Sequence, residues 1–330
     1  MSKLRLTFAC WDYDRTRALA EGSVTAEGID LNYLNLPVEE TFFRMARYRE
    51  FDLAEMSLST YTVTLSGDDP PFIAIPVFPS RAFRHSSIYV SNRSTIRQPS
   101  DLVGKRIGTP EYEMTAPVWI RGLLQDEYGV DPAGVQYFIG GEEETGRVEK
   151  VKLNLPARFK LNPIGPTSTL SQMLAEGEID ALHTARMPST YLSRPGTVRR
   201  LFENYVEVEQ DYYRRTRIFP IMHTVVMRRE LYRANPWIAQ SLFKAFVRAQ
   251  RKTYEDLYIT AALKVMLPWQ IAHVEETRRV LGNNWWAYGL EPNRQVLDTF
   301  LRYHYEQGLS QRRLKPEELF APETFEEFKI

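Results

Sequence analysis

The chain has 330 residues, enough for about two domains or lobes that each bury a core of their own. Its 42 basic residues balance its 42 acidic residues, so no overall charge favours nucleic acid or an anionic membrane as a partner. The single cysteine, Cys10, excludes an internal disulfide and a cysteine-based metal cluster. Recognition by charge must therefore come from local clusters.

The N-terminal segment does not read as a secretory signal. Only the uncharged residues 6–11 separate Arg5 from Asp12, whereas a signal peptide needs roughly 7 to 15 apolar residues and a cleavage site. No stretch approaches the ~18 uninterrupted apolar residues of a transmembrane helix. We therefore expect a cytoplasmic protein without a membrane partner.

The first 65 residues alternate between strand and helix patterns. Residues 3–10 alternate apolar and polar side chains, and residues 13–22 have a helical composition that ends at Gly22. The same succession returns as a strand at 29–36, a helix after Pro37, a strand at 51–57 and a helix that follows it. This alternation favours βα units and a parallel sheet.

The middle of the chain continues in the same way. A strand is expected at 105–108 and a helix from about Thr115 to Tyr128, with Pro117 in its first turn and Gly129 as its C-terminal stop. Residues 140–169 are rich in Gly, Pro and charge and lack periodicity. They predict a segment made mostly of loops.

An internal echo links two distant segments. Residues 49–61 (REFDLAEMSLSTY) and 177–191 (GEIDALHTARMPSTY) both follow an amphipathic helix, and both place Glu, an apolar residue and Asp before a short strand. One echo of this length is weak evidence for duplication, but it fits two lobes that are built alike.

The last third predicts mainly helices. Asn235 and Pro236 signal the start of one, and helical patterns continue through 276–290 and 293–308. Before them, a strand at 218–227 would return the chain to the first lobe. The predicted organisation is an α/β protein in which residues 1–89 and 219–330 form one lobe and residues 90–218 form a second, inserted lobe.

Candidate ligand-binding residues follow the predicted strands, because ligands of open α/β sheets bind beyond the carboxyl ends of the strands. If residues 81–85 form a helical turn, Arg81, Arg84 and His85 share one face and could meet an anion. Singly, each candidate also fits an ordinary role as a helix cap or a solvated charge. The candidates are Arg15, Glu55, Ser57, Ser59, Arg81, Arg84, His85, Tyr112, Thr115, His183, Arg186 and His223.

No cofactor motif is present in the sequence. It contains no Gly-x-Gly-x-x-Gly, no P-loop and no His-Glu-x-x-His, and its five histidines are not spaced as metal ligands. Residues 142–144, three glutamates in a predicted loop, are expected to be solvated. We therefore predict no cofactor and no metal site, and a divalent metal has no support in the sequence.

Four segments taken together resemble a known family: FDLAEMSLSTY, PPFIAIPVFPSRAFRHSSIYV, DLVGKRIGTPEYEMTAPVWIRGLL and TLSQMLAEGEIDAL. They are similar to 4,5-dihydroxyphthalate decarboxylases, a family whose fold resembles the type II periplasmic solute-binding proteins. The resemblance implies two α/β lobes, a hinge of two crossing strands near residues 86–90 and 218–226, and a ligand cleft between the lobes. It implies a small aromatic dicarboxylate as partner, with non-oxidative conversion of 4,5-dihydroxyphthalate to 3,4-dihydroxybenzoate and CO2 in phthalate degradation.

Within this hypothesis the candidates take roles. His85 is the first choice for proton transfer, since an imidazole titrates near pH 6.5, and His223 or Glu55 complements it. Arg81 or Arg15 holds the carboxylate that stays on the ring. Ser57, Ser59 and Thr115 assist in binding that carboxylate. Tyr112 contacts the ring hydroxyls, and Phe83 or Trp119 forms a less polar wall of the site.

Two alternatives remain open at this point. The same fold and cleft also suit a solute-binding protein for a small carboxylated ligand, without chemistry. The second alternative is a different enzyme with this fold, such as a lyase of menaquinone precursor synthesis or a relative of the pyrimidine synthases of thiamine formation. Whether the chain forms a homo-oligomer is also open.

Overall fold

The alternating segments at the N-terminus form three adjacent strands of a five-stranded sheet in the computed structural model, which describes residues 2–325. The strand order is β2-β1-β3-β11-β4. β1 is parallel to β2 and β3, whereas β11 is antiparallel to β3 and β4. The strands are β1 (Leu4–Cys10), β2 (Ile29–Asn35), β3 (Leu53–Ser57), β4 (Phe72–Ile75) and β11 (His223–Arg228).

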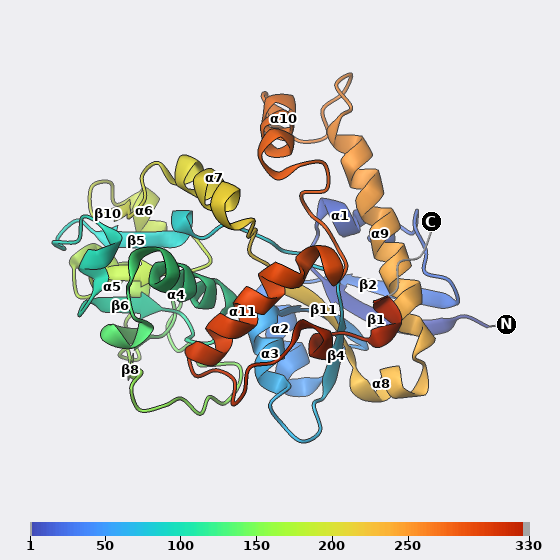
Figure 1. The fold of residues 1–330 in the computed structure, drawn as a ribbon, viewed down its shortest axis with the longest axis horizontal. Coiled ribbons are helices and arrows are strands. Elements are labelled where there is room, and N and C mark those ends of the chain that lie inside the picture. Colours follow the sequence, from blue (N-terminus) through green and yellow to red (C-terminus); the bar gives the residue numbers. More distant parts are fainter. Residues whose placement is uncertain (1, 326–330) are drawn as a thin grey trace. The chain divides into compact units, whose positions relative to one another are not determined.

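Among the described residues, the first unit groups 2–81, 221–297 and 315–325. Its helices are α1 (Asp14–Ala20), α2 (Val38–Tyr48), α3 (Leu58–Thr64), α8 (Arg229–Ala234), α9 (Trp237–Leu257) and α10 (Gln270–Leu281). α9 is the longest of them and lies beside α1 (Figure 1), with Ile238, Leu242 and Phe246 buried along one face.

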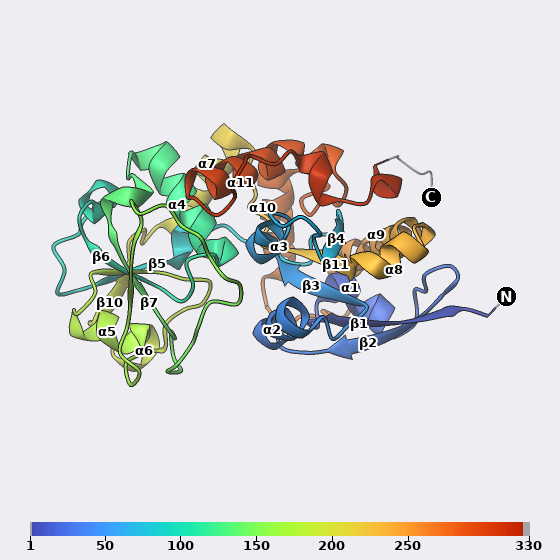
Figure 2. The same ribbon diagram turned by 90° about the horizontal axis from the view of Figure 1, so that it is seen from below.

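The second unit groups residues 82–220 and 298–314 around a six-stranded sheet of order β10-β5-β9-β6-β7-β8. Its strands are β5 (Ile88–Ser91), β6 (Arg106–Thr109), β7 (Gln136–Ile139), β8 (Lys160–Pro163), β9 (Ala181–His183) and β10 (Val198–Arg200). Its helices are α4 (Thr115–Tyr128), α5 (Leu170–Glu176), α6 (Ser189–Ser193) and α7 (Tyr205–Thr216). Figure 2 shows α4 on one side of these strands and α5 and α6 on the other.

The two sheets repeat one plan, as the internal echo predicts. β3 lies between a parallel neighbour, β1, and an antiparallel one, β11; β9 lies in the same way between β6 and β5. Asp52 and Asp180, the aspartates of the echo, each accept a backbone N–H of the parallel neighbour, from Thr7 (2.9 Å) and Arg106 (3.0 Å). The echo therefore marks equivalent strands.

The predicted lobe boundaries differ from these units in one important respect. Residues 298–314, expected in the first lobe, group with the second unit, where the later part of α11 (Arg294–Glu306) packs on α4. The ring of Trp119 lies 5.5 Å from that of Phe300 and 5.7 Å from that of Tyr303. Sequence periodicity identifies the helix but not the core that it joins. The chain also passes between units at 81–82 and 220–221, close to the predicted 89–90 and 218–219.

Several element ends also differ from expectation. The helix expected through 276–290 ends at Leu281, where Gly282 adopts a left-handed φ of 88°, so Trp285 and Trp286 lie beyond it. Asn235 does not cap α9, because its side-chain amide donates to the carbonyl of Leu231. Within the described residues, no helix is both long and apolar enough for a membrane crossing.

Candidate active site

A carboxylate, an imidazole and a phenol meet at one edge of the first unit's sheet. Glu55 lies near the carboxyl end of β3, and His223 begins the antiparallel β11 opposite Ser57. Tyr13 follows the carboxyl end of β1. His223 Nδ1 and the Tyr13 hydroxyl each lie 2.6 Å from Glu55 Oε1. This is the edge at which ligands of open α/β sheets bind.

Glu55 is fully buried and held in its ionised form. Its other oxygen accepts the backbone N–H of Trp11 (3.2 Å) and the thiol of Cys10 (3.5 Å). Burial raises the pKa of Glu55, but His223, through its charge when protonated and its hydrogen bond, and the hydrogen bonds from Tyr13 and Trp11 bring this pKa below its usual value. Burial and the neighbouring Glu55 raise the pKa of Tyr13, so the phenol keeps its proton.

His223 is oriented for proton transfer through its second nitrogen. Its Nδ1 is committed to Glu55, and its ring packs edge-on against Phe42 at 4.8 Å. Nε2 has no hydrogen-bond partner in the described part of the chain, and the side chain is 17% exposed. A carboxylate on Nδ1 fixes the tautomer and stabilises the imidazolium that forms when Nε2 takes a proton.

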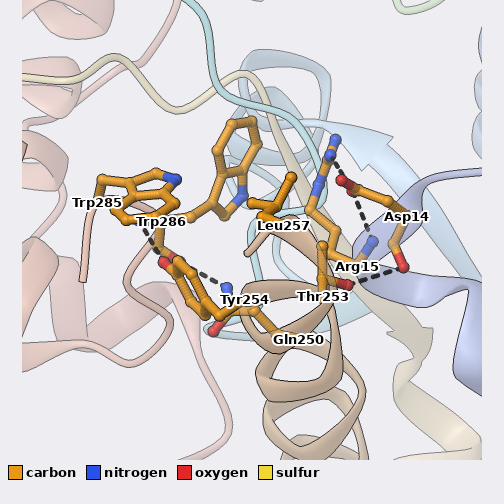
Figure 3. A pocket seen from close by; sticks show the side chains of 8 residues that line it. All are labelled: Asp14, Arg15, Gln250, Thr253, Tyr254, Leu257, Trp285 and Trp286. Carbon is orange, nitrogen blue, oxygen red and sulfur yellow. Dashed lines mark hydrogen bonds and ion pairs between the residues drawn. The ribbon is translucent and has the colours of Figure 1, made fainter. Parts of the chain in front are cut away.

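Next to this edge is a pocket, which we call the tryptophan pocket, with a cavity volume of about 130 Å³. Figure 3 shows its side chains coming from the start of α1, from α9 and from the segment after α10. The lining residues are Asp14, Arg15, Gln250, Thr253, Tyr254, Leu257, Trp285 and Trp286. The sequence analysis included Arg15 and none of the other seven.

Arg15 lines the tryptophan pocket and also contacts Tyr13, the phenol that bonds Glu55. Its guanidinium stacks over the ring of Tyr13 (4.1 Å) and over that of Trp286 (4.3 Å). Nε donates to the carbonyl of Pro79 (2.5 Å) and Nη1 to Asp14 (3.0 Å). Nη2 has no acceptor among the described residues, and the side chain is 16% exposed, so Arg15 keeps donors for an anion.

Other predicted residues of the first unit have structural roles. The Ser57 hydroxyl accepts the backbone N–H of Thr60 and so caps α3, and Ser59 is buried in the same helix. Arg81 is buried, and it donates to Asn293 Oδ1 (2.7 Å) and to the carbonyl of Ala287 (3.4 Å). These bonds occupy donors that the hypothesis reserved for a substrate carboxylate.

Residues 81–85 do not form one helical turn. Arg81 belongs to the first unit, whereas Arg84 and His85 belong to the second, and the helical turn spans only His85–Ser87. The condition of that prediction, a helical turn over 81–85, is therefore not met, and a ligand-binding role of these three residues stays a prediction. Arg84 is buried and donates to Ser87 (3.5 Å) and to the carbonyl of Ala185 (3.4 Å).

His85 occupies an apolar environment within the second unit. It is buried, its ring packs edge-on near Phe202 (5.3 Å) and Tyr212 (5.1 Å), and neither ring nitrogen has a hydrogen-bond partner within residues 2–325. Burial, with the nearby charge of Arg215, lowers the pKa of His85 to about 4. His183 is similar, with its pKa lowered to about 3 by burial and by Arg121. The geometry favours His223 over His85 for proton transfer.

Three further candidates lie in the second unit. Tyr112 is buried under the guanidinium of Arg121 (4.0 Å) and donates to the carbonyl of Gln307 (3.3 Å), while Thr115 is the buried first residue of α4. Arg186 is exposed just after β9, and its guanidinium has no bonding partner in the described chain. Of the proposed apolar wall, Trp119 is fully buried between α4 and α11, and Phe83 stacks on Phe219 (4.8 Å).

Glu142 was expected in a solvated loop, and the structure corrects this. It is 6% exposed, lies just after β7 and bonds the hydroxyl of Thr184 (2.5 Å). Its second oxygen has no partner among the described residues. Burial raises the pKa of Glu142 to about 7. A glutamate that follows a strand closely was the available signal, because polar groups at strand ends of α/β sheets are often buried at sites.

One cluster of carboxylates has the spacing of a cation site, formed by Glu111, Glu113 and Glu149 with ligand oxygens within 4.8 Å of one another. Lys150 Nζ lies 2.5 Å from Glu111, and Arg147 also pairs with it. Cationic side chains thus already balance much of the charge. Burial, with the charge of Glu111, raises the pKa of Glu149 to about 7.

Comparisons with known proteins agree on fold and family. A sulfonate-binding protein of Methylobacillus flagellatus superposes with a TM-score of 0.55 at 14% identity, over 98% of this chain and 93% of that one. An alkanesulfonate-binding protein of Xanthomonas axonopodis gives 0.53 at 12% identity, over 98% of both chains. These likenesses show a two-lobed fold of the periplasmic-binding-protein type.

No family model matches the chain. Two curated proteins are similar to the chain in sequence. A 4,5-dihydroxyphthalate decarboxylase of Comamonas testosteroni is 43% identical over 330 residues, which is the full length of both chains. A protein of the same name from Pseudomonas putida is 44% identical over 214 residues, covering 65% of this chain and 83% of the relative. The chain is therefore a decarboxylase that belongs to the 4,5-dihydroxyphthalate decarboxylase family.

Proposed function

We propose that this protein converts 4,5-dihydroxyphthalate to 3,4-dihydroxybenzoate and CO2 without a cofactor, and that Glu55 and His223 transfer the phenolic proton. The observation that carries the assignment of residues is the 2.6 Å contact between His223 Nδ1 and a buried, ionised Glu55. The full-length relative supports the substrate.

The substrate can serve as its own electron sink. Each carboxylate of 4,5-dihydroxyphthalate is para to a hydroxyl, so loss of a phenolic proton raises the electron density on the carbon that carries the carboxylate. Protonation of that carbon by a proton from solvent, the one that the net reaction consumes, gives a dienone. The C–C bond to the carboxylate then breaks, its electrons return to the ring as CO2 leaves, and the phenolate takes back a proton. The net reaction consumes one proton.

His223 is suited to the phenolic proton. Its Nε2 takes the proton, and the buried carboxylate of Glu55 stabilises the resulting imidazolium across the Nδ1 bond. When the ring becomes a phenolate again, the same imidazolium returns the proton. Tyr13 keeps Glu55 in place through its hydroxyl and needs no proton transfer of its own.

Arg15 is proposed to bind the carboxylate that stays on the ring. A guanidinium bound to the departing carboxylate would stabilise the ground state more than the CO2-like transition state and slow the reaction. The grip therefore belongs on the carboxylate that stays. Arg15 fits this role better than Arg81, because its Nη2 is available while Arg81 already bonds Asn293 and Ala287.

The test is turnover by the purified protein after treatment with EDTA, followed as CO2 release and formation of 3,4-dihydroxybenzoate. We expect product at the same rate before and after divalent metal is restored. Product only after metal addition would contradict the cofactor-free part of the proposal. Binding of the substrate without any product would contradict catalysis and favour the solute-binding alternative.

A cytoplasmic location and a homo-oligomer stay predictions. Fractionation of the producing cells tests the first, and analytical ultracentrifugation of the purified protein tests the second. Neither result changes the chemistry assigned to Glu55 and His223.

A further inference from the structure

The tryptophan pocket has walls suited to a flat ring. Trp285 and Tyr254 meet edge to face, with ring centroids 4.7 Å apart, and Trp286 and Leu257 add further apolar surface. Its volume of about 130 Å³ is close to that of the engineered cavity of about 150 Å³ that holds benzene. The pocket therefore has room for one six-membered ring.

One tryptophan is held rigidly in this wall. The indole N–H of Trp286 donates to the carbonyl of Phe78 (2.8 Å), its backbone N–H donates to the Tyr254 hydroxyl (2.9 Å), and its carbonyl accepts from Gln250 Nε2 (2.6 Å). These bonds fix the ring over which Arg15 stacks. Trp286 thus sets both the wall and the position of the cation.

Trp285 is attached differently. Its recorded interaction is the ring contact with Tyr254, and the structure gives it no hydrogen bond within the described residues. The side chain is half-buried. Replacement of Trp285 by a smaller residue would therefore break none of the hydrogen bonds that hold this segment. A change in ligand affinity after that replacement would report on the contact between the ligand and the indole ring.

The polar groups of the pocket define the ring's substituents. Arg15 Nη2 is available for a carboxylate. Gln250 Oε1 has no donor among the residues described, and Asp14 Oδ2 lies free of the bonds that Oδ1 makes to Arg15, so both can accept from phenolic hydroxyls. A cation and acceptors that line the same pocket match a hydroxylated aromatic carboxylate.

We infer that the tryptophan pocket binds the ring of a monocyclic hydroxylated aromatic carboxylate, with Arg15 as its anion partner, and that Trp285 determines which ring sizes are accepted. The identity of this ligand as substrate and product rests on the proposed function. The binding site itself does not, because its walls and its cation are independent of the Glu55–His223 pair.

The experiment compares three proteins: wild type, Trp285→Ala and the control Trp269→Ala, whose indole is 73% exposed at the start of α10. Calorimetry with 3,4-dihydroxybenzoate measures affinity, and kinetics with 4,5-dihydroxyphthalate give KM and kcat. We expect Trp285→Ala to weaken binding and to raise KM by about 10-fold with kcat nearly unchanged, because an aromatic contact is lost without loss of chemistry. Trp269→Ala should match wild type.

A bicyclic probe sharpens the test. 3-Hydroxy-2-naphthoate should bind wild type poorly and bind Trp285→Ala relatively better, because the shortened wall leaves room for a second ring. Equal affinities of all three proteins for 3,4-dihydroxybenzoate would overturn the inference even if turnover is normal. If wild type shows no turnover but its binding still depends on Trp285, the pocket stands and the proposed function fails.

Discussion

Glu55 is a buried charge that stays ionised because four donors surround it. Burying a carboxylate without partners costs several kcal/mol, and here the cost is offset by His223, Tyr13, Trp11 and Cys10. The arrangement leaves His223 with one committed and one available nitrogen. A single residue thus determines the tautomer of the proposed base.

His223→Asn should lower kcat by about 100- to 10,000-fold while substrate still binds, because the acid–base group is lost and the arginine is not. His85→Asn should leave kcat within a few-fold of wild type, since His85 is buried, neutral and without polar partners among the described residues. Steady-state kinetics decide between the two histidines. The reverse ranking would restore His85 as the proton-transfer group.

The raised pKa of Glu142 predicts that the stability of the fold depends on pH. Its pKa of about 7 in the fold lies above the ordinary 4.5, so the folded state holds more protons between these values and the free energy of unfolding falls as pH rises through this window. The loss is on the order of 3 kcal/mol when complete. Glu149, whose pKa is also raised to about 7, adds a loss of the same sign.

Glu142→Gln should therefore flatten part of that slope. Urea unfolding at pH 5 and pH 8 measures it, and Glu144→Gln is the matched control, because Glu144 is exposed nearby in the same loop. A slope that is identical in wild type and Glu142→Gln would show that Glu142 titrates normally.

At the scale of elements, one aspartate in each sheet ties β3 or β9 to its parallel neighbour. Asp180 bonds the backbone N–H of Arg106 (3.0 Å) and its guanidinium (2.9 Å), and Asp52 bonds Thr7 and Arg228 in the same manner. Burial raises the pKa of Asp180, but the bonds from Arg106 outweigh this and lower it. The contribution of Asp180 is thus present at neutral pH and lost as pH falls.

Asp180→Ala should lower the free energy of unfolding by about 2 kcal/mol at pH 7, because a partly buried N–H and a guanidinium lose their acceptor. Asp30→Ala, at an exposed position of β2, should cost less than about 0.5 kcal/mol. Denaturant unfolding of both variants gives the comparison. Equal costs would mean that Asp180 does not stabilise the sheet.

The sequence predicts local elements better than their partners. The helix Thr115–Tyr128 has the expected ends, because Pro117 and Gly129 mark them locally, and the echo around Asp52 and Asp180 identifies equivalent strands. The pairing of Glu55 with His223 joins residues 168 positions apart, and nothing local selects His223 over His85. The tryptophan pocket is also non-local, since it forms only where α10 stops early.

At the scale of the whole molecule, residues 298–314 belong to a unit that otherwise ends at residue 220. Phe300→Ala should therefore destabilise the second unit, by about 3 kcal/mol or more for a fully buried phenylalanine. Hydrogen exchange should speed up in β6 and β9 and change little in β1 and β3. Faster exchange confined to β1 and β3 would contradict the grouping.

The return of the chain at residues 298–314 has a consequence for synthesis on the ribosome. Domains commonly fold in order as they emerge, but here the second unit lacks the side chains that cover Trp119 until residue 303 has been made. The first unit likewise needs β11 and α9, which come after residues 82–220, the larger part of the second unit. At a synthesis rate of about 5 to 20 residues per second, both cores of the nascent chain stay incomplete for several seconds. During that time their exposed apolar surfaces must be kept from aggregating.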